Sequence, residues 1–296
     1  MERRNNDTLW KGMLERVFDD LLRFLFLNAD RAFDLDRGFE FLDKELAELY
    51  PEPDKKSDTR FVDKLVKVYQ RDGTEEWVLA HVEVQGHHDA EFAKRMFKYY
   101  CRIFDRYDRP LTAIAIFTGR DGKRLPDRYE RRFEGTELTY RYNTLYILDY
   151  VDAELEASDN PFAVVTLVAK KALLEGRVLD PDLLKEKLSL AKLLLNKGFS
   201  KWKVEGILSF LKNYIRFADP DFNRIFDKEI DGFTGKTIHM DIIEQVKQMK
   251  IDEAVEKKTA SVVKNLLEQT KFTAEKIADI AGVSIEFVEE VRQGKH

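Results

Sequence analysis

The sequence has almost no cysteine and no long apolar run. Cys101 is the single cysteine among 296 residues, which excludes an intrachain disulfide framework and a cysteine-rich zinc site. Because no run of about 18 apolar residues occurs, no transmembrane helix is expected. The first residues, MERRNNDTLW, lack the apolar core of a secretion signal. These absences predict a cytoplasmic protein, since thiols stay reduced there.

The charge excludes a uniformly basic protein. The net charge is −5, so any surface for nucleic acid must be local. A hydrophobic content of 44% is enough for a sizeable core, and 296 residues predict one larger unit with accessory helices.

Helical and strand patterns alternate in the first half of the chain. Apolar periodicity predicts helices, and alternation or a continuous apolar run predicts strands. The expected elements are a helix over 7–27, a helix over 38–49, strands over 60–69 and 77–85, a helix over 89–107, a strand over 111–118, a loop over 119–132 and a strand over 137–148. The two strands flanking Asp72-Gly73 read as a β-hairpin, because both turn positions favour positive φ. This order predicts an α/β fold, with a mixed sheet flanked by helices.

Only helical patterns follow, which predicts an all-helical C-terminal region. Helices are expected from Asn160-Pro161, from Pro181 and from Ser200, followed by a long charged helix over 238–270. Two short helices around Gly282 then resemble a helix-turn-helix. The last of them, SIEFVEEVRQ, is acidic, which favours packing or homodimer formation over reading DNA. The predicted domains are 1–151, 152–237 and 238–296.

The stretch WVLAHVEVQ, residues 77–85, is the most informative one. Side chains alternate between two faces along a strand. One face carries Val78 and Ala80 and is expected to pack on the core, whereas the other ends in the polar pair Glu83 and Gln85. That pair indicates either a solvated face or a site.

Asp63, on the preceding strand, strengthens the prediction of a site. Two carboxylates on adjacent strands can converge on one Mg²⁺ or Mn²⁺ ion, which can activate a water for attack on a phosphodiester. The alternative is that Asp63 pairs with a nearby lysine and Glu83 lies on a solvated edge. The residues alone leave both interpretations open.

Several spaced motifs resemble one known family. DKLVKV, HVEVQ and FAKRMFKYYCRIFDRY occur in order, with FLDKEL upstream and SDNPFAVV downstream. Together they are similar to the Rpn family of recombination-promoting nucleases and transposase-like proteins, within the PD-(D/E)XK nuclease superfamily. The resemblance covers roughly residues 7–175. It implies a restriction-endonuclease-like core and magnesium-dependent DNA cleavage.

The resemblance also implies roles for individual residues. Asp63 and Glu83 take the places of the two motif acids, and Gln85 stands where the superfamily usually has lysine. A neutral amide can hydrogen-bond but supplies no positive charge. Lys67, on the Asp63 face of its strand, is the candidate to supply it, although an exposed surface lysine is the simpler interpretation. Glu45 is either a third metal ligand from a helix or a solvated carboxylate.

His81 shares a face with Glu83. It is either a residue lining the site or a structural histidine, and a lone histidine is more often structural.

A basic region lies between Lys94 and Arg132. It contains twelve Lys or Arg residues and only five Asp or Glu residues, interleaved with tyrosines. Such a local excess of positive charge is typical of phosphate-binding surfaces. The predicted DNA contacts are Arg95, Lys98, Arg102, Arg106, Lys123 and Arg124.

The sequence therefore predicts a metal-dependent DNA endonuclease, with a link to recombination or mobile elements. The alternative is a nuclease-fold protein with weak or no catalysis that acts in DNA binding or assembly. Nothing in these residues distinguishes DNA from RNA.

Overall fold

A computed structural model describes residues 6–42, 44, 61–83, 91–120, 124–234, 259–267, 270 and 272–292. The chain divides into two compact units. The first combines Met1–Leu49 with Asp54–Ile242, and the second combines Tyr50–Pro53 with Ile243–His296.

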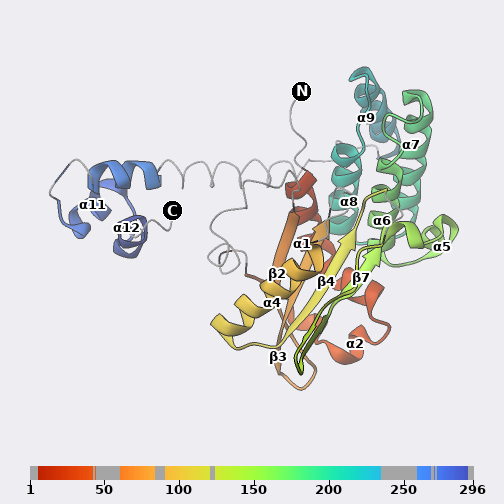
Figure 1. The fold of residues 1–296 in the computed structure, drawn as a ribbon. Coiled ribbons are helices and arrows are strands. Elements are labelled where there is room, and N and C mark those ends of the chain that lie inside the picture. The colour runs from red at the N-terminus through yellow and green to blue at the C-terminus, as the bar shows by residue number, and fades with distance from the viewer. Residues whose placement is uncertain are drawn as a thin grey trace. The chain divides into compact units, whose positions relative to one another are not determined.

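The first unit is built on a five-stranded mixed sheet with the strand order β1-β2-β3-β4-β7 (Figure 1). The strands are β1 (Glu40–Phe41), β2 (Phe61–Tyr69), β3 (Glu75–Glu83), β4 (Leu111–Phe117) and β7 (Asn143–Tyr146). The first three are antiparallel, whereas β4 runs parallel to β3 and β7 parallel to β4. The predicted mixed α/β sheet is confirmed.

The β2–β3 hairpin closes through a longer turn than the sequence predicts. Gly73 adopts φ 87°, but Asp72 does not have positive φ. The amide of Gly73 donates to the Gln70 carbonyl at 2.9 Å, and the Asp72 carboxylate accepts from the Thr74 amide at 2.8 Å. Asp72 therefore stabilises the turn through its side chain rather than through its backbone conformation.

Both faces of β3 are buried as far as His81, whereas the sequence predicted a core contact only for the Val78 face. Val78 and Ala80 are inaccessible on one face, and Leu79 and His81 are equally inaccessible on the other. A strand that pairs on both sides and is covered on both faces has no solvated face along this part of its length.

The face of the sheet that carries Leu79 and His81 is covered by α4 (Phe92–Tyr107), within the helix predicted over 89–107. Phe92, Met96 and Ile103 are buried beneath it. The helix ends at Asp108, which has φ 46°, and the chain passes directly into β4.

The opposite face is covered by α1 (Asn6–Leu25), which is kinked at Val17. The α1 helix packs on β2 and on two helices from later in the chain, α6 and α8. The fully buried ammonium of Lys64 on β2 pairs with Glu15 of α1 at 2.5 Å. A charge on this face is thus neutralised within the helix–sheet contact.

Five helices follow the sheet in the chain, within the described range 124–234. These helices, which we call the helical layer, are α5 (Asp152–Ala157), α6 (Pro161–Ala172), α7 (Asp180–Asn196), α8 (Lys201–Tyr214) and α9 (Asp221–Thr234). The side chain of Asn160 caps α6 by accepting from the Phe162 amide at 2.8 Å, and Ser200 caps α8 by accepting from the Lys203 amide. The two short elements α5 and α9 are not among the predicted helices.

The region 119–148 differs most from the prediction. Part of the expected loop is β5 (Arg128–Phe133), and the expected single strand is divided into β6 (Thr136–Arg141) and β7. β5 and β6 form a separate two-stranded sheet. Their turn, Glu134-Gly135, has positive φ at both residues, as a two-residue hairpin turn requires.

The predicted helix over 38–49 is wrong at its start. Residues after α2 (Ala29–Ala32) form a 3-10 turn, η1 (Leu35–Arg37), and then β1, whose residues pair with β2. The positions 43 and 45–49 lie outside the described residues.

The second unit contains a small helical core. Residues 259–267 are helical, and α11 (Ala274–Ala281) and α12 (Ile285–Arg292) follow. Thr273 caps α11, and Gly282 ends it in a left-handed conformation, as predicted. The three helical segments share the buried side chains Val263, Ile277, Ala278, Val288 and Val291. Most of the predicted long helix over 238–270 lies outside the described residues.

Across the part of the chain that the structure describes, no helix is both long enough and apolar enough to cross a membrane.

We predict that Gly206→Ala destabilises the protein, although alanine is the better helix former. Gly206 lies in α8 against α1, and an added Cβ would come within 2.2 Å of the Arg16 Cδ. Arg16 is buried and stacks on the Trp202 ring at 3.6 Å, so it has little freedom to move. The expected loss is about 1–3 kcal/mol, which exceeds the gain of about 0.5–1 kcal/mol in helix propensity.

Gly232→Ala in α9 is the matched control, because nothing lies within 4 Å of its added Cβ. Urea denaturation should show Gly232→Ala equal to or more stable than wild type and Gly206→Ala less stable. Equal stabilisation by both substitutions would show that Arg16 yields freely.

We predict a pH-dependent contribution of Lys187 to stability. Its buried ammonium donates to the carbonyls of Lys212 and Ile215 at 2.9 and 2.8 Å. Burial lowers the pKa of Lys187 to about 7 from 10.5, although nearby Asp227 opposes the shift. Between these two values the unfolded chain binds more protons than the folded protein, so the free energy of unfolding rises with pH.

Urea midpoints of wild type and Lys187→Met from pH 6 to pH 10 test this. The wild-type advantage over the variant should increase from about pH 7 upward. Lys185→Met, at a position whose side chain is 79% exposed, should instead run parallel to wild type. Parallel curves for Lys187→Met would contradict the prediction.

Candidate functional site

The β2–β3 hairpin brings two of the predicted site positions together. Asp63 pairs with His81 across the two strands, and Phe61 pairs with Glu83. Positions 63 and 83 are therefore diagonal neighbours on one face, and such neighbours have Cα atoms about 7–8 Å apart. This backbone register permits one cation to be shared, which is what the sequence predicts.

Several of the predicted ligands lie outside the described part of the structure. This holds for Gln85 and Glu45, and for the side chains of Asp63 and Glu83. Among the described residues, no three His, Cys, Asp or Glu side chains are grouped so that they could hold a metal. The metal site thus remains a prediction that rests on the register of the hairpin.

His81 is a core residue on the face of the sheet that carries positions 63 and 83. It is fully buried, and its ring lies 5.2 Å from Phe92 and 6.3 Å from Tyr99, both on α4. These contacts favour the structural interpretation of His81. They also show that α4 covers the face as far as His81, so only the end of the strand beyond it is left for a substrate.

Aromatic side chains line the edge of the sheet at which β3 ends. Glu83 pairs with Phe117 on β4, and Phe117 pairs with Tyr146 on β7. The Phe117 and Tyr146 rings stack at 4.5 Å. Carboxyl ends of parallel strands are where α/β sheets usually bind ligands. The predicted site lies at such an edge.

Two tyrosines at this edge are held as hydrogen-bond donors. Tyr146 donates to the Leu125 carbonyl at 2.9 Å, and Tyr142 donates to the Pro126 carbonyl. Burial raises the pKa of both hydroxyls. They therefore remain protonated at neutral pH and are unsuited to act as bases.

Among the predicted DNA contacts, Arg95 lies nearest to the start of α4. It is half-buried, with its guanidinium 5.2 Å from the Phe92 ring centre, and it acts electrostatically on Tyr142. Because α4 follows β3 in the chain, its first turns lie toward the end of β3. Arg95 is therefore on the same side as the predicted metal position.

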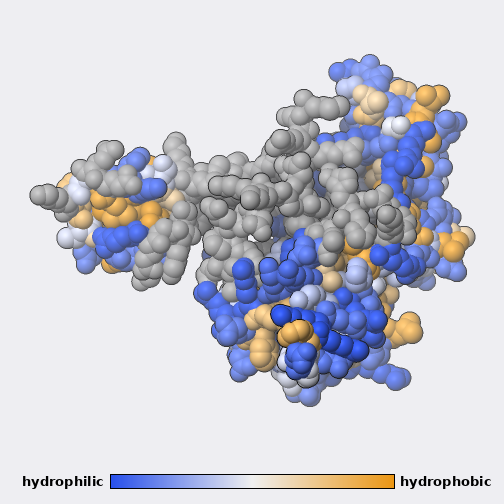
Figure 2. Space-filling model, viewed as in Figure 1, coloured by the Kyte–Doolittle hydropathy of each residue, from blue (hydrophilic) through white to orange (hydrophobic). Residues whose placement is uncertain are grey.

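Three further predicted contacts lie along the outer side of α4. Lys98, Arg102 and Arg106 are exposed and spaced by four residues, so they share one face of the helix. Lys94 continues this row toward the helix start and pairs with Glu91 at 2.8 Å. Figure 2 shows mainly hydrophilic surface over the part of the first unit that contains α4 and the sheet. We call Lys94, Lys98, Arg102 and Arg106 the α4 basic row.

The two remaining predicted contacts come from the segment after β4. Arg124 is exposed but is held by Asp149, with both carboxylate oxygens 2.9 Å from one guanidinium nitrogen. Its charge is therefore largely compensated. Lys123 lies outside the described residues.

Lys67 lies toward the opposite end of β2. It is four residues from Asp63, about 13 Å at the usual rise of a strand. Its ammonium pairs with Glu40 of β1, and that hydrogen bond raises the pKa of Lys67. This placement favours a structural role over a direct one in the predicted site.

Comparison with protein-family models, curated proteins and solved structures yields no match. A function for this chain must therefore be argued from its own residues.

The β5–β6 hairpin forms an arm beside α4 that the sequence did not predict. It carries four arginines and three glutamates, with Arg128 paired to Glu130 and Arg132 paired to Glu137. The Phe97 ring of α4 stacks on Tyr129 of β5 at 5.1 Å, and Tyr100 of α4 contacts Tyr140 of β6 at 4.9 Å. Beyond these contacts the arm carries exposed Arg131, Arg132 and Phe133. Its one local signal is Gly135, which tolerates the positive φ of a tight turn, because the flanking strands are mostly exposed.

Proposed function

We propose that this protein is a metal-dependent DNA endonuclease that hydrolyses phosphodiester bonds. The observation that carries the proposal is the register of β2 and β3, which makes positions 63 and 83 diagonal neighbours on one face. Two carboxylates at such positions suit Mg²⁺ or Mn²⁺, which prefer oxygen ligands.

The fold supports the same proposal. An antiparallel hairpin carries both acids, and α4 then crosses over to the parallel strand β4. This arrangement is compatible with the restriction-endonuclease-like core that the resemblance to Rpn nucleases implies. The comparisons supply no relative from which a function could be transferred, so the proposal depends on these residues.

Each part of the site has its own task in the proposed reaction. Asp63 and Glu83 would hold the metal, with Glu45 as the candidate third ligand. The bound metal would lower the pKa of a water and offset the charge that develops on the phosphate. The amide of Gln85 would orient that water or the substrate through hydrogen bonds. Arg95 and the α4 basic row would bind the phosphates that flank the scissile bond.

Gln85 also gives the strongest support to the alternative function. A neutral amide at the usual lysine position supplies no charge, and Lys67 is engaged by Glu40 at a distance along β2. The alternative is a nuclease-fold protein that binds DNA or assembles with other chains without efficient cleavage. The small core of the second unit, including the acidic helix α12, suits a packing or homodimer role in either case.

Three further aspects of the proposal rest on the sequence. A link to recombination rests on the family resemblance, and a cytoplasmic setting rests on the cysteine content. A DNA rather than an RNA substrate also follows from the resemblance and needs its own test.

We predict that the purified protein of residues 1–296 nicks or cuts supercoiled plasmid with Mg²⁺ or Mn²⁺, and not with Ca²⁺ or EDTA. Asp63→Ala and Glu83→Ala should each lower the rate by about a hundredfold or more, because each removes a metal ligand. Gel electrophoresis of the plasmid is the measurement. A single-stranded RNA in place of the plasmid tests whether the protein also cleaves RNA. Glu156→Ala, at an exposed position of α5, is the control with unchanged rate.

Gln85→Lys separates the two functions. If the protein is a nuclease, Gln85→Lys should raise the rate of DNA cleavage, because it places a cation beside the attacking water. DNA binding by the wild type with no cleavage in any metal, and none after Gln85→Lys, would support the binding function instead. Full activity in Glu83→Ala would show that the site has been assigned to the wrong residues.

We predict that the α4 basic row binds phosphates, which a salt titration of DNA affinity can measure. Each phosphate contact contributes about 0.9 to the slope of log K against log salt on duplex DNA. The triple variant Lys98→Ala, Arg102→Ala, Arg106→Ala should therefore weaken binding and flatten the slope by up to about 3. Fluorescence anisotropy at several salt concentrations gives both quantities.

The matched control is Lys185→Ala, Lys201→Ala, Arg224→Ala, which removes three exposed cations from α7, α8 and α9. Its slope should equal that of wild type. Equal slopes for both triple variants would place the DNA elsewhere.

A further inference from the structure

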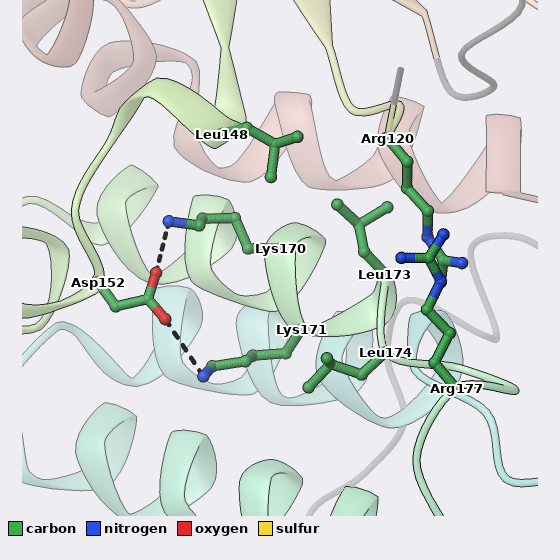
Figure 3. A pocket seen from close by; sticks show the side chains of 8 residues that line it. All are labelled: Arg120, Leu148, Asp152, Lys170, Lys171, Leu173, Leu174 and Arg177. Atoms are coloured by element: carbon green, nitrogen blue, oxygen red, sulfur yellow. Dashed lines mark ion pairs between the residues drawn. The ribbon is translucent and has the colours of Figure 1, made fainter. Parts of the chain in front are cut away.

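A cationic pocket lies apart from the β2–β3 hairpin. It has a volume of about 300 Å³ and lies in the first unit, where the end of the sheet meets the helical layer. The chain segments that line it are the residues after β4, the turn η2 (Ile147–Asp149), α5, the end of α6 and the turn that follows α6. The lining residues are Arg120, Leu148, Asp152, Lys170, Lys171, Leu173, Leu174 and Arg177 (Figure 3).

The charge of the lining is strongly positive, with four cations and one acid. Asp152 is shared by Lys170 at 2.5 Å and Lys171 at 3.2 Å, and Lys171 also contacts Glu186 at 2.8 Å. Burial opposes ionisation of Asp152, but the two lysines hold its pKa below the usual value. Even with Glu186 included, the cluster has two more cations than acids.

Two arginines, Arg120 and Arg177, lie at one side of the pocket. Figure 3 shows Arg120 and Arg177 extending toward one another from different chain segments, whereas Asp152 lies with the lysines. A guanidinium nitrogen of Arg120 donates to the Glu175 carbonyl at 3.4 Å, which positions the side chain. Two guanidinium groups that line one pocket repel through their like charge, and an anion bound by both relieves that repulsion.

The three leucines provide an apolar side. Leu148, Leu173 and Leu174 line the same cavity as the cations. A ligand that combines an anionic group with a less polar body therefore matches the lining better than a bare ion does. The volume is at the lower limit for pockets that bind small organic ligands.

We propose that this pocket binds the terminal phosphate of a nucleotide-sized ligand, with the phosphate between Arg120 and Arg177. A phosphate monoester carries close to two negative charges at neutral pH, and each guanidinium presents a fork of donors that fits phosphate oxygens. The sugar or base lies against the leucines. This ligand comes either from a free nucleotide or from the 5′-phosphorylated end of a strand.

The position of the pocket connects it with the sheet edge described above. Arg120 lies three residues after Phe117, and Phe117 pairs with Glu83. The pocket therefore belongs to the same edge of the sheet and is displaced toward β7. The inference does not require that Glu83 binds a metal, because phosphate recognition here uses only cations of the chain.

Isothermal titration calorimetry of the protein of residues 1–296 in EDTA tests the proposal. The probes are dAMP, deoxyadenosine, and one short single-stranded oligonucleotide with and without a 5′-phosphate. We expect binding of dAMP and of the phosphorylated oligonucleotide, none of deoxyadenosine, and a dissociation constant at least tenfold higher in Arg177→Glu. Arg224→Glu, at an exposed position of α9, should bind as wild type does.

The two sources are distinguished by the oligonucleotide. If the 5′-phosphorylated strand binds at least tenfold more tightly than dAMP and the unphosphorylated strand does not displace dAMP, the pocket holds strand ends. If dAMP binds as tightly as the phosphorylated strand, the ligand is a free nucleotide.

Three results would overturn the proposal: binding of neither dAMP nor the phosphorylated strand at millimolar concentration, equal displacement of dAMP by the strand with and without the phosphate, or unchanged dAMP binding in Arg177→Glu. Arg177→Gln repeats the test if Arg177→Glu melts earlier than wild type. Because the measurement needs neither metal nor cleavage, its outcome is separate from that of the plasmid assay.

Discussion

The burial of the central sheet on both faces is the constraint on which the rest of the structure depends. Strands β3 and β4 carry long apolar stretches, so they need cover on each side. α4 supplies it on one face, and α1 with the helical layer supplies it on the other. Only the ends of the strands remain for chemistry. The predicted metal positions and the cationic pocket both lie at the end where β3, β4 and β7 finish.

Two lysine side chains are buried where helices pack on the sheet and on one another. Lys64 lies beneath α1, and Lys187 lies between α7 and the end of α8, both without solvent exposure. A buried cation is tolerated only when acceptors surround it. Glu15 serves Lys64, and two backbone carbonyls serve Lys187. These contacts therefore fix how α1 packs on the sheet and how α7 packs on the end of α8.

Much of the fold could be predicted because its signals are local. Asn160, Ser200, Thr273 and Gly282 mark helix ends through contacts with their own neighbours in the chain, and the structure places helix ends at each of them. The region 119–148 could not be predicted in the same way. Its strands β5 and β6 are mostly exposed and rich in charge, so no apolar pattern sets them apart from a loop. The chain also changes sheets at Tyr142 without an interruption of its strand-like composition.

In the candidate site, too, features with a local sequence signal could be predicted, and contacts between distant residues could not. That Asp63 and Glu83 lie on adjacent strands followed from the hairpin pattern, and the register agrees with it. That His81 is buried by α4, and that Lys67 is held by Glu40, depends on elements distant in sequence. The cationic pocket escaped prediction for a related reason. Its residues come from several separate segments, and none of these segments contains a recognisable motif.

The β5–β6 arm limits where related sequences can carry insertions. Its tyrosines contact α4 from one face of the arm, and side chains alternate faces at every residue. One residue inserted within either strand would turn the aromatic contacts beyond it toward solvent. Two inserted residues, or a longer turn in place of Glu134-Gly135, would preserve them. Insertions in this arm should therefore accumulate at the turn or arrive in pairs.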